Sequence, residues 1–236
     1  MVQLSIRTNP KSSPQVFAVG EERTPVIILD DFALDTGDVI RYAVQSASFA
    51  PDEAYVYPGV RAKPPKQYIQ EIVRALGPLL GQVYSIPAGL ALAVNSYYSL
   101  VATPPEKLQV LQRVPHFDST TRYFYAVTHY LNPGDFGGTG LFRHTPTGFE
   151  NVTEDRLQAY AQAGDSYLRA HGDPPAEYIR ATDDHYELFE AIDYRPNRLI
   201  AYPGSLLHSG LIDPDRDINP DPATGRLTAN FFMRFK

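Results

Sequence analysis

The sequence contains no cysteine. This absence excludes disulfide bonds, thiolate zinc sites, iron–sulfur clusters and cysteine nucleophiles. Any metal ion that the chain binds must therefore have nitrogen and oxygen ligands. The absence does not locate the protein, because a chain without thiols is compatible with both reducing and oxidising compartments.

Lys and Arg form no consecutive block, and the formal net charge is -6. Nucleic acid is therefore not an expected partner. The sequence also has no run of apolar residues long enough to cross a membrane, and residues 1–17 are polar and interrupted by Pro10 and Pro14. We expect a cytoplasmic protein without a membrane partner, and its oligomeric state stays open.

With 236 residues, of which 43% are apolar, the chain is long enough to bury the core of one domain. We predict a single domain over residues 1–236. Residues 1–89 form an N-terminal support of strand and helices, residues 90–149 and 197–236 form the β core, and residues 150–196 form a helical insertion. The core segments are short, and they lack the alternation of strand and helix that a parallel sheet requires. The expected fold class is mainly β with flanking helices.

Periodicity predicts the individual elements. Apolar residues at helical spacing indicate helices over 36–48, 66–81 and 153–171, and a further short helix within 176–192. Segments rich in aromatic and β-branched residues indicate strands at 26–29, 90–100, 109–115, 123–131, 138–144, 198–202, 206–212 and 226–235. We expect the insertion to lie over the sheet, outside its hydrogen-bonded strands.

Three residues have the types needed for a metal site. His116 and Asp118 are two residues apart at the end of a predicted strand, so their side chains point to the same face. His208 follows a tight Pro-Gly turn on a late strand and completes a set of two histidines and one carboxylate. Such a set leaves open the positions that ferrous iron needs for a bidentate cosubstrate and oxygen. Alone it is weak evidence, because a His-x-Asp tripeptide occurs by chance in roughly four of ten chains of this composition.

Further motifs accompany these residues in a fixed order. They are Val-Ile-Ile-Leu-Asp-Asp-Phe at 26–32, Thr-His-Tyr-Leu-Asn at 128–132, Gly-Gly-Thr-Gly-Leu-Phe at 137–142, Asn-Arg-Leu-Ile-Ala-Tyr-Pro-Gly at 197–204 and Arg-Leu-Thr at 226–228. With His116, Asp118 and His208, this series resembles the iron(II)/2-oxoglutarate-dependent dioxygenase superfamily of the prolyl-hydroxylase-like type. More narrowly, the chain resembles an uncharacterised bacterial subgroup of that superfamily, which indicates no substrate.

The resemblance implies a double-stranded β-helix, which is a jelly-roll or cupin-like barrel. It implies an oxidoreductase in which His116, Asp118 and His208 hold Fe(II), while Arg226, Thr228 and Tyr130 bind the far carboxylate of the cosubstrate 2-oxoglutarate. Because a carboxylate occupies the position that a halide would need, hydroxylation is favoured over halogenation. The substrate would be a small molecule or an amino-acid residue of a peptide.

The guanidinium of Arg226 has the planar fork that a carboxylate requires. In the superfamily the cosubstrate arginine lies closer in sequence to the distal histidine than it does here, where residues 213–225 lengthen the interval. A longer loop costs little free energy, so the strands need not move. The longer interval leaves Arg216 and Arg234 as alternatives to Arg226.

Several other polar residues could bind a ligand or could have a structural role only. Residues 183–185, Asp-Asp-His, offer ligands for a cation, but acidic residues at a predicted helix start favour the helix dipole and a solvated face. His129 alternates with Tyr130 on its strand, so it faces away from the site and is structural. Arg143 and His144 are candidates for the wall of a substrate pocket, and an anionic substrate would explain Arg143.

Two other functions stay open. The first is a cupin-like hydrolase or isomerase that holds zinc, manganese or nickel and binds an anionic substrate through Arg226. The second is a non-catalytic relative that binds metal or ligand. For the oxygenase, we expect the loop at 55–65 and the insertion at 150–196 to cover the mouth of the pocket.

Overall fold

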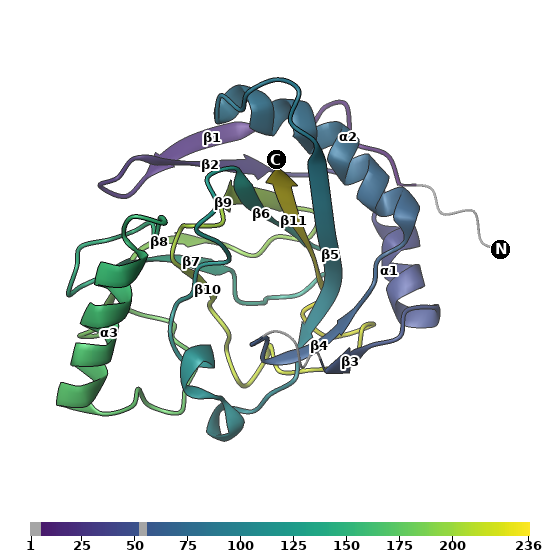
Figure 1. Ribbon diagram of the computed structural model, residues 1–236. Helices are drawn as coiled ribbons and strands as arrows, with labels where there is room; N and C mark the ends of the chain where they lie inside the picture. Colours follow the sequence, from purple (N-terminus) through teal and green to yellow (C-terminus); the bar gives the residue numbers. More distant parts are fainter. Residues whose placement is uncertain (1–5, 52–55) are drawn as a thin grey trace.

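The computed structural model describes residues 6–51 and 56–236. In this part of the chain the fold is mainly β, with two antiparallel sheets (Figure 1). The large sheet has the strand order β1 (Gln15–Val19), β2 (Thr24–Leu29), β9 (Leu199–Pro203), β6 (Phe124–Tyr130), β11 (Thr228–Phe235), β5 (Leu92–Val101), β4 (Gly59–Ala62) and β3 (Ala50–Pro51). The small sheet has the order β10 (His208–Gly210), β7 (Thr139–His144) and β8 (Tyr186–Ile192).

Helices α1 (Gly37–Gln45) and α2 (Lys66–Val83) cover one face of the large sheet (Figure 1). Every second residue of β11 points to this face, and Ala229, Phe231 and Met233 are fully buried there. Full burial of a large apolar side chain contributes about 1.5–3 kcal/mol, so this layer forms the main core. The helices use their apolar stripes for the same contact, and the buried residues of α2 are Tyr68, Ile72, Leu76 and Leu80.

The intervening residues of β11 point to the opposite face, where Thr228, Asn230 and Phe232 line a cavity. Helix α3 (Leu157–His171) flanks this side of the molecule, near the small sheet (Figure 1). None of its residues is fully buried, but Tyr160, Gly164 and Leu168 line the cavity. One strand therefore serves both the core and the cavity.

Most predicted elements are confirmed, but residues 109–115 do not form a strand. They contain a short 3₁₀ turn, Val110–Gln112, closed by a reciprocal hydrogen-bond pair in which the Gln109 amide donates to the side chain of Gln112 at 2.8 Å. The local glutamine contacts replace ladder hydrogen bonds. His116 consequently lies in an isolated β-bridge, outside any named strand.

The prediction of a helix within 176–192 is also wrong, because residues 186–192 form strand β8 in the small sheet. The carboxylate of Asp183 accepts hydrogen bonds from the amides of His185 and Tyr186, which fixes a turn just before this strand. The insertion therefore contributes a hydrogen-bonded strand in addition to α3. Strand β1 was not predicted, and it forms an edge hairpin with β2 that turns at Gly20, where φ is +65°.

The described residues contain no helix with the length and apolarity of a membrane span. The first five residues of the polar segment 1–17 and residue 55 of the predicted covering loop lie outside the described ranges. Residues 56–58 line the cavity as expected, whereas 59–62 form β4.

Candidate metal centre

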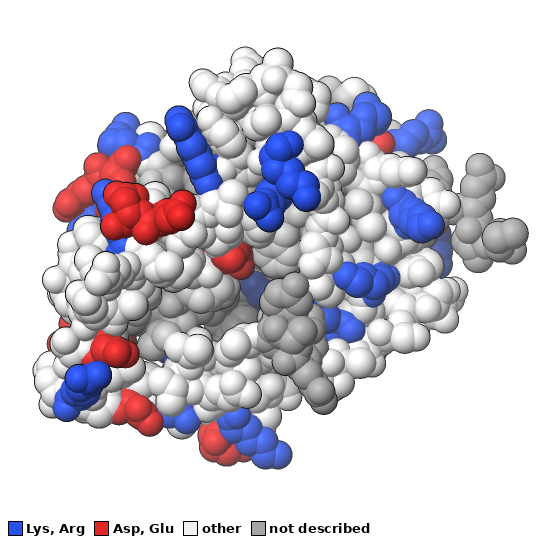
Figure 2. Space-filling view, in the orientation of Figure 1, with Lys and Arg blue, Asp and Glu red and all other residues white. Residues whose placement is uncertain are grey.

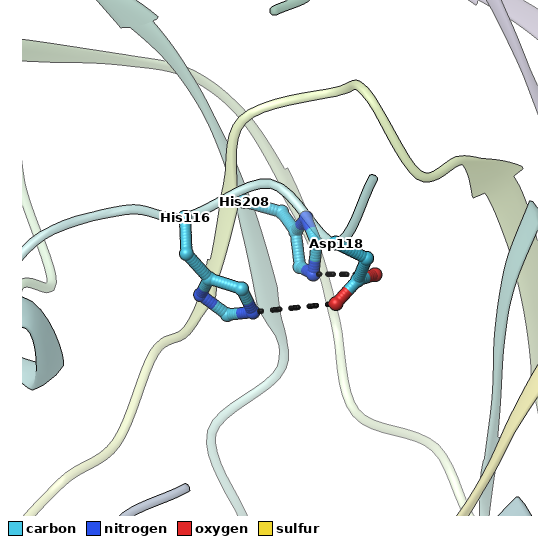
Figure 3. A group of neighbouring side chains, drawn as sticks. All are labelled: His116, Asp118 and His208. Atoms are coloured by element: carbon cyan, nitrogen blue, oxygen red, sulfur yellow. Dashed lines mark ion pairs between the residues drawn. The ribbon is translucent and has the colours of Figure 1, made fainter. Parts of the chain in front are cut away.

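The side chains of His116, Asp118 and His208 converge on one point (Figure 3). One ligand atom from each residue lies within 4.8 Å of the other two. The backbones of the two histidines form the β-bridge: the amide of His116 donates to the carbonyl of His208 at 2.9 Å, and the reverse bond measures 2.8 Å. Directly opposed residues send their side chains to the same face, so the bridge brings both imidazoles together.

The tight turn after β9 places the carboxylate. The amide of Asp118 donates to the carbonyl of Gly204 at 2.7 Å. A side chain at position 204 would put its Cβ 2.4 Å from the ring of Phe124, so only glycine allows this close approach. The Asp118 carboxylate then lies 3.9 Å from Nε2 of His116 and 3.6 Å from Nε2 of His208 (Figure 3).

The protonation states suit metal ligands. Nδ1 of His208 lies 2.8 Å from the carbonyl oxygen of Leu206, to which it must donate, so Nε2 keeps its lone pair for the site. The surrounding protein lowers the pKa of His116 well below its ordinary value, and the positive charges of His208 and Arg61 act in the same direction. The imidazole of His116 is therefore available as a neutral ligand near pH 7.

One oxygen of Asp118 shows that the site fits a cation. Its Oδ2 atom is buried, and no hydrogen-bond partner for it exists in the described part of the chain. Burial raises the pKa of Asp118, while the charges of His208 and Arg61 oppose the rise. A buried carboxylate oxygen without a partner costs free energy, and a bound cation would remove that cost. Two imidazole nitrogens and one carboxylate oxygen suit a divalent transition metal.

The ligands lie in the wall of a cavity of about 900 Å³ between the two sheets. Figure 2 shows this hollow near the centre of the face viewed in Figure 1. Its volume is in the range of small-molecule sites, and most of its walls are apolar or aromatic. The cavity is large enough for more than one small ligand beside the metal ligands.

Arg226 and Thr228 both line this cavity. The guanidinium of Arg226 is fixed from behind, because Nε donates to the carbonyl of Gly137 at 2.7 Å and Nη2 donates to that of Gly138 at 3.1 Å. Its central carbon lies 5.8 Å from the ring centre of Tyr130. The two glycines are required here, since a Cβ at position 137 would lie 1.8 Å from the carbonyl oxygen of Leu211.

The remaining cosubstrate candidates lie elsewhere. Tyr130 is fully buried behind the cavity wall, and its hydroxyl hydrogen-bonds to Thr139 at 2.7 Å. Arg216 lies at the surface, where it forms ion pairs with Asp135 and Asp213. Arg234 lines the cavity but is exposed at its rim. Of the three arginines considered for the cosubstrate, Arg226 is the buried one that faces the cavity.

The structure also tests the predictions for His129 and for residues 183–185. The structural role predicted for His129 is confirmed, because it faces the helices and hydrogen-bonds to Tyr68 at 2.5 Å and Asn197 at 3.1 Å. The solvated face predicted for residues 183–185 is confirmed for Asp183 and Asp184, which are exposed. It is wrong for His185, which is buried, lines the cavity and has its Nε2 3.0 Å from Nε2 of His144. The turn before β8 folds this histidine inward.

Arg143 and His144 do not line the cavity, contrary to the prediction. Arg143 forms ion pairs with Glu150 at 2.6 Å and Glu187 at 2.8 Å, so carboxylates of the fold neutralise its charge. His144 lies behind His185, fully buried, and burial lowers its pKa to about 4.

Sequence reasoning missed Tyr202 and Arg61. The ring of Tyr202 lies 4.8 Å from that of His208, and its hydroxyl is influenced by the charges of both Asp118 and Arg226. Period-two alternation on β9 places it on the cavity face, so a signal was present. Arg61 also lines the cavity, but it was hidden in a segment interpreted as a loop.

Comparisons with solved structures give distant likenesses. HygX from Streptomyces hygroscopicus, solved with nickel, 2-oxoglutarate and hygromycin B bound, is 13% identical, with 89% of this chain and 83% of that chain covered and a TM-score of 0.42. An N-substituted L-amino acid dioxygenase from Burkholderia ambifaria is 10% identical, with coverage of 95% and 94% and a TM-score of 0.38. At these TM-scores the likenesses carry no weight for the chemistry of this chain.

A comparison with curated proteins gives no match. Residues 10–233 match the model of a family of unknown function, DUF6445. This match covers nearly the whole chain, from just before β1 to within β11. The chain therefore belongs to the family of unknown function DUF6445.

Proposed function

We propose that this protein is a mononuclear non-haem iron(II) oxygenase that uses 2-oxoglutarate and hydroxylates a small molecule or an amino-acid residue. The observation that carries the proposal is the convergence of His116, Asp118 and His208 at a cavity wall, with a free Nε2 on His208 and an unpartnered carboxylate oxygen. In this proposal the two sheets are the halves of a double-stranded β-helix.

The three ligands would hold the metal on one side and leave its other positions open to the cavity. When bound, ferrous iron supplies the redox chemistry that activates oxygen. The chain's own task is to keep the ligands oriented: the Leu206 carbonyl fixes the ring of His208, and the Gly204 carbonyl fixes the backbone of Asp118. These contacts come from rigid backbone, which keeps the geometry constant.

Arg226 would bind the far carboxylate of 2-oxoglutarate, with Thr228 beside it on the same wall. The hydrogen bonds to Gly137 and Gly138 fix the guanidinium plane before any ligand arrives. An aromatic wall that includes Tyr202 and Tyr160 excludes water around the cosubstrate. Residues 56–58 and helix α3 border the mouth, which supports the role expected for the loop and the insertion.

An anaerobic titration with Fe(II) and 2-oxoglutarate tests the proposal. We expect a metal-to-ligand charge-transfer band in the wild-type protein and none in His208→Ala. The matched control is His171→Ala, because His171 is an exposed histidine on α3 and its loss should leave the band unchanged. Lack of a band in iron-loaded wild-type protein would rule out the proposal. Succinate release that needs both iron and 2-oxoglutarate separates it from a hydrolase or an isomerase.

A further inference from the structure

Asn230 lies on the cavity wall beside the residues proposed to bind the cosubstrate. Alternate residues of an extended chain share one face, so Arg226, Thr228 and Asn230 form one row at the start of β11. All three line the cavity. Neither the metal ligands nor the proposed cosubstrate contacts include Asn230. Its polar amide, in a wall that is mainly apolar and aromatic, therefore calls for an explanation.

The side chain of Asn230 is held by hydroxyl groups on three adjacent strands. Its Oδ1 atom accepts a hydrogen bond from Thr128 of β6 at 3.0 Å. Its Nδ2 atom donates to the hydroxyl of Ser99 of β5 at 2.9 Å and to that of Thr228 of β11 at 3.1 Å. Strand pairing brings these groups together, since Thr128 is paired directly with Asn230. Ser99 is paired in the same way with Thr228. Both the donor and the acceptor of the amide are bonded, which fixes its plane.

These bonds determine what the hydroxyl of Thr228 offers to the cavity. A threonine hydroxyl has one proton to donate and two lone pairs that accept. Because Nδ2 of Asn230 donates to Thr228, the proton of Thr228 points away from the amide. Its acceptor among the described residues is the carbonyl of Ser99 at 3.5 Å, which is longer than the roughly 2.5–3.0 Å of an ordinary O–H···O bond. A ligand at an ordinary distance would therefore receive this proton.

The opposite orientation of the amide would reverse this polarity. Oδ1 of Asn230 would then accept the proton of Thr228, and the lone pairs of the hydroxyl would face the cavity. A carboxylate offers only acceptor atoms, so it binds a hydroxyl that donates and is repelled by one that does not. The hydrogen bond from Thr128 to Oδ1 holds the amide in the orientation that leaves the proton of Thr228 to a ligand.

We propose that Asn230 is a positioning residue that keeps the hydroxyl of Thr228 a donor to the far carboxylate of 2-oxoglutarate. This inference rests on the proposed function and deepens it with a residue that acts through Thr228. Arg226 supplies the positive charge at this end of the cosubstrate. Thr228 supplies a neutral donor, whose direction Asn230 sets.

A double-mutant cycle, read by anaerobic titration of the charge-transfer band with 2-oxoglutarate, tests the inference. Asn230→Ala should raise the dissociation constant of 2-oxoglutarate about fivefold or more, because the hydroxyl of Thr228 loses its orientation. Thr228→Val should raise it by a similar or larger factor. In Thr228→Val protein, adding Asn230→Ala should change it less than about twofold, since no hydroxyl remains to be oriented. A purely structural role of Asn230 would give the same loss in both backgrounds.

Thr128→Val and Asn95→Ala complete the design. Thr128→Val frees the amide of Asn230 without removing it, so it should weaken 2-oxoglutarate about threefold or more, again only where Thr228 is present. It takes the place of Asn230→Ala in the cycle if that variant does not fold. Asn95→Ala is the matched control, because Asn95 lines the same cavity but hydrogen-bonds to Lys63 and Tyr97. It should bind 2-oxoglutarate like the wild-type protein.

The outcomes separate this inference from the proposed function. Lack of a charge-transfer band in iron-loaded wild-type protein would refute the proposed function itself. If the band forms, an unchanged dissociation constant in Asn230→Ala or in Thr228→Val would overturn the inference alone. An equal loss on adding Asn230→Ala to either background, or an equal loss in Asn95→Ala, would also overturn it, and the proposed function would stand.

Discussion

Arg226 combines a charge with a fixed plane, and its replacement separates the two. Arg226→Lys keeps the charge but loses the fork that hydrogen-bonds to Gly137 and Gly138. We expect both Arg226→Lys and Arg226→Gln to raise the dissociation constant of 2-oxoglutarate by about tenfold to a hundredfold, because hydrogen bonds to charged groups contribute about 1.5–3 kcal/mol. The effect should be larger in Arg226→Gln, which also loses the charge. The measurement is the anaerobic titration of the charge-transfer band.

Arg216→Gln is the control for this titration, because Arg216 is not part of the cavity lining and forms exposed ion pairs with Asp135 and Asp213. It should bind 2-oxoglutarate like the wild-type protein. Unchanged affinity in Arg226→Gln would show that another group binds the far carboxylate.

Asp118 illustrates a conflict between stability and metal binding. Its buried Oδ2 has no hydrogen-bond partner among the described residues, so the metal-free protein contains an uncompensated buried oxygen. We expect Asp118→Asn to leave the melting temperature of the metal-free protein unchanged or higher. The variant should lose the stabilisation by metal, which is about 2.7 kcal/mol, or about 5–10 °C, for wild-type protein at a hundred times the dissociation constant.

Thermal unfolding with and without Mn(II), a redox-stable substitute for Fe(II), measures both effects. A variant that melts lower without metal and still gains stability from Mn(II) would show that Asp118 is a structural residue.

At the scale of elements, the sequence predicts the helices and strands whose buried residues repeat with a regular period. The helix over 66–81 and the strand over 123–131 were found because their buried faces repeat with a helical or a two-residue period. The strand at 186–192 was missed because it is paired only with β7, through a register shift at Leu141 and Phe142. No local pattern encodes such a pairing.

The same limit applies to the site. His116, Asp118 and His208 were identified because their motifs occur in a fixed order, and the structure brings them together. Arg61 was not, because its place in the cavity wall depends on the four-residue strand β4 and on pairing with Ser99, which is distant in sequence. Such a short strand has too few residues for a periodic signal.

Through Asp217, the loop at 213–225 supports Arg226 without contacting its guanidinium directly. Asp217 is fully buried, and its carboxylate accepts hydrogen bonds from the amides of Gly137 and Asp213. The carbonyl of Gly137 in turn accepts from Arg226. The loop therefore holds the peptide on which the guanidinium rests.

We expect Asp217→Asn to raise the dissociation constant of 2-oxoglutarate about tenfold while iron affinity stays within about twofold, because one of two carboxylate acceptors becomes a donor facing an amide. Separate titrations of Fe(II) and 2-oxoglutarate distinguish this from a general loss of folding, which would weaken both. Equal weakening of both ligands would assign Asp217 to overall stability alone.

At the scale of the whole molecule, the two faces of the large sheet have separate tasks. Helices α1 and α2 seal one face into the main core, which leaves the other face for polar residues and the cavity. His129 lies on the sealed face and connects the layers, since it hydrogen-bonds to Tyr68 of α2 and to Asn197 before β9. The oxygen of Asn197 requires a proton on Nε2, so the ring is neutral with Nδ1 as the acceptor from Tyr68.

This buried histidine makes stability depend on pH. Burial lowers the pKa of His129 to about 4, against about 6.5 in an unfolded chain. Between these values the unfolded state binds more protons than the folded state, so the free energy of unfolding falls as the pH decreases from about 6.5 to 4. The loss due to His129 amounts to about 3 kcal/mol.

Urea unfolding at pH 7.5, 6.5, 5.5 and 4.5 measures how the free energy of unfolding depends on pH. In His129→Gln the fall in this free energy should be smaller by the contribution of His129, because glutamine can donate to Asn197 and accept from Tyr68 without titrating. His144 titrates in the same window in both proteins, so the difference between them isolates His129. The ion pair with Arg74 lowers the pKa of Glu71 to about 2, and its stabilisation is lost only below about pH 4.5, outside the window measured. If His129→Gln loses stability with pH as steeply as the wild-type protein, His129 is not the group that links acid to unfolding, and other buried histidines such as His144 carry the effect.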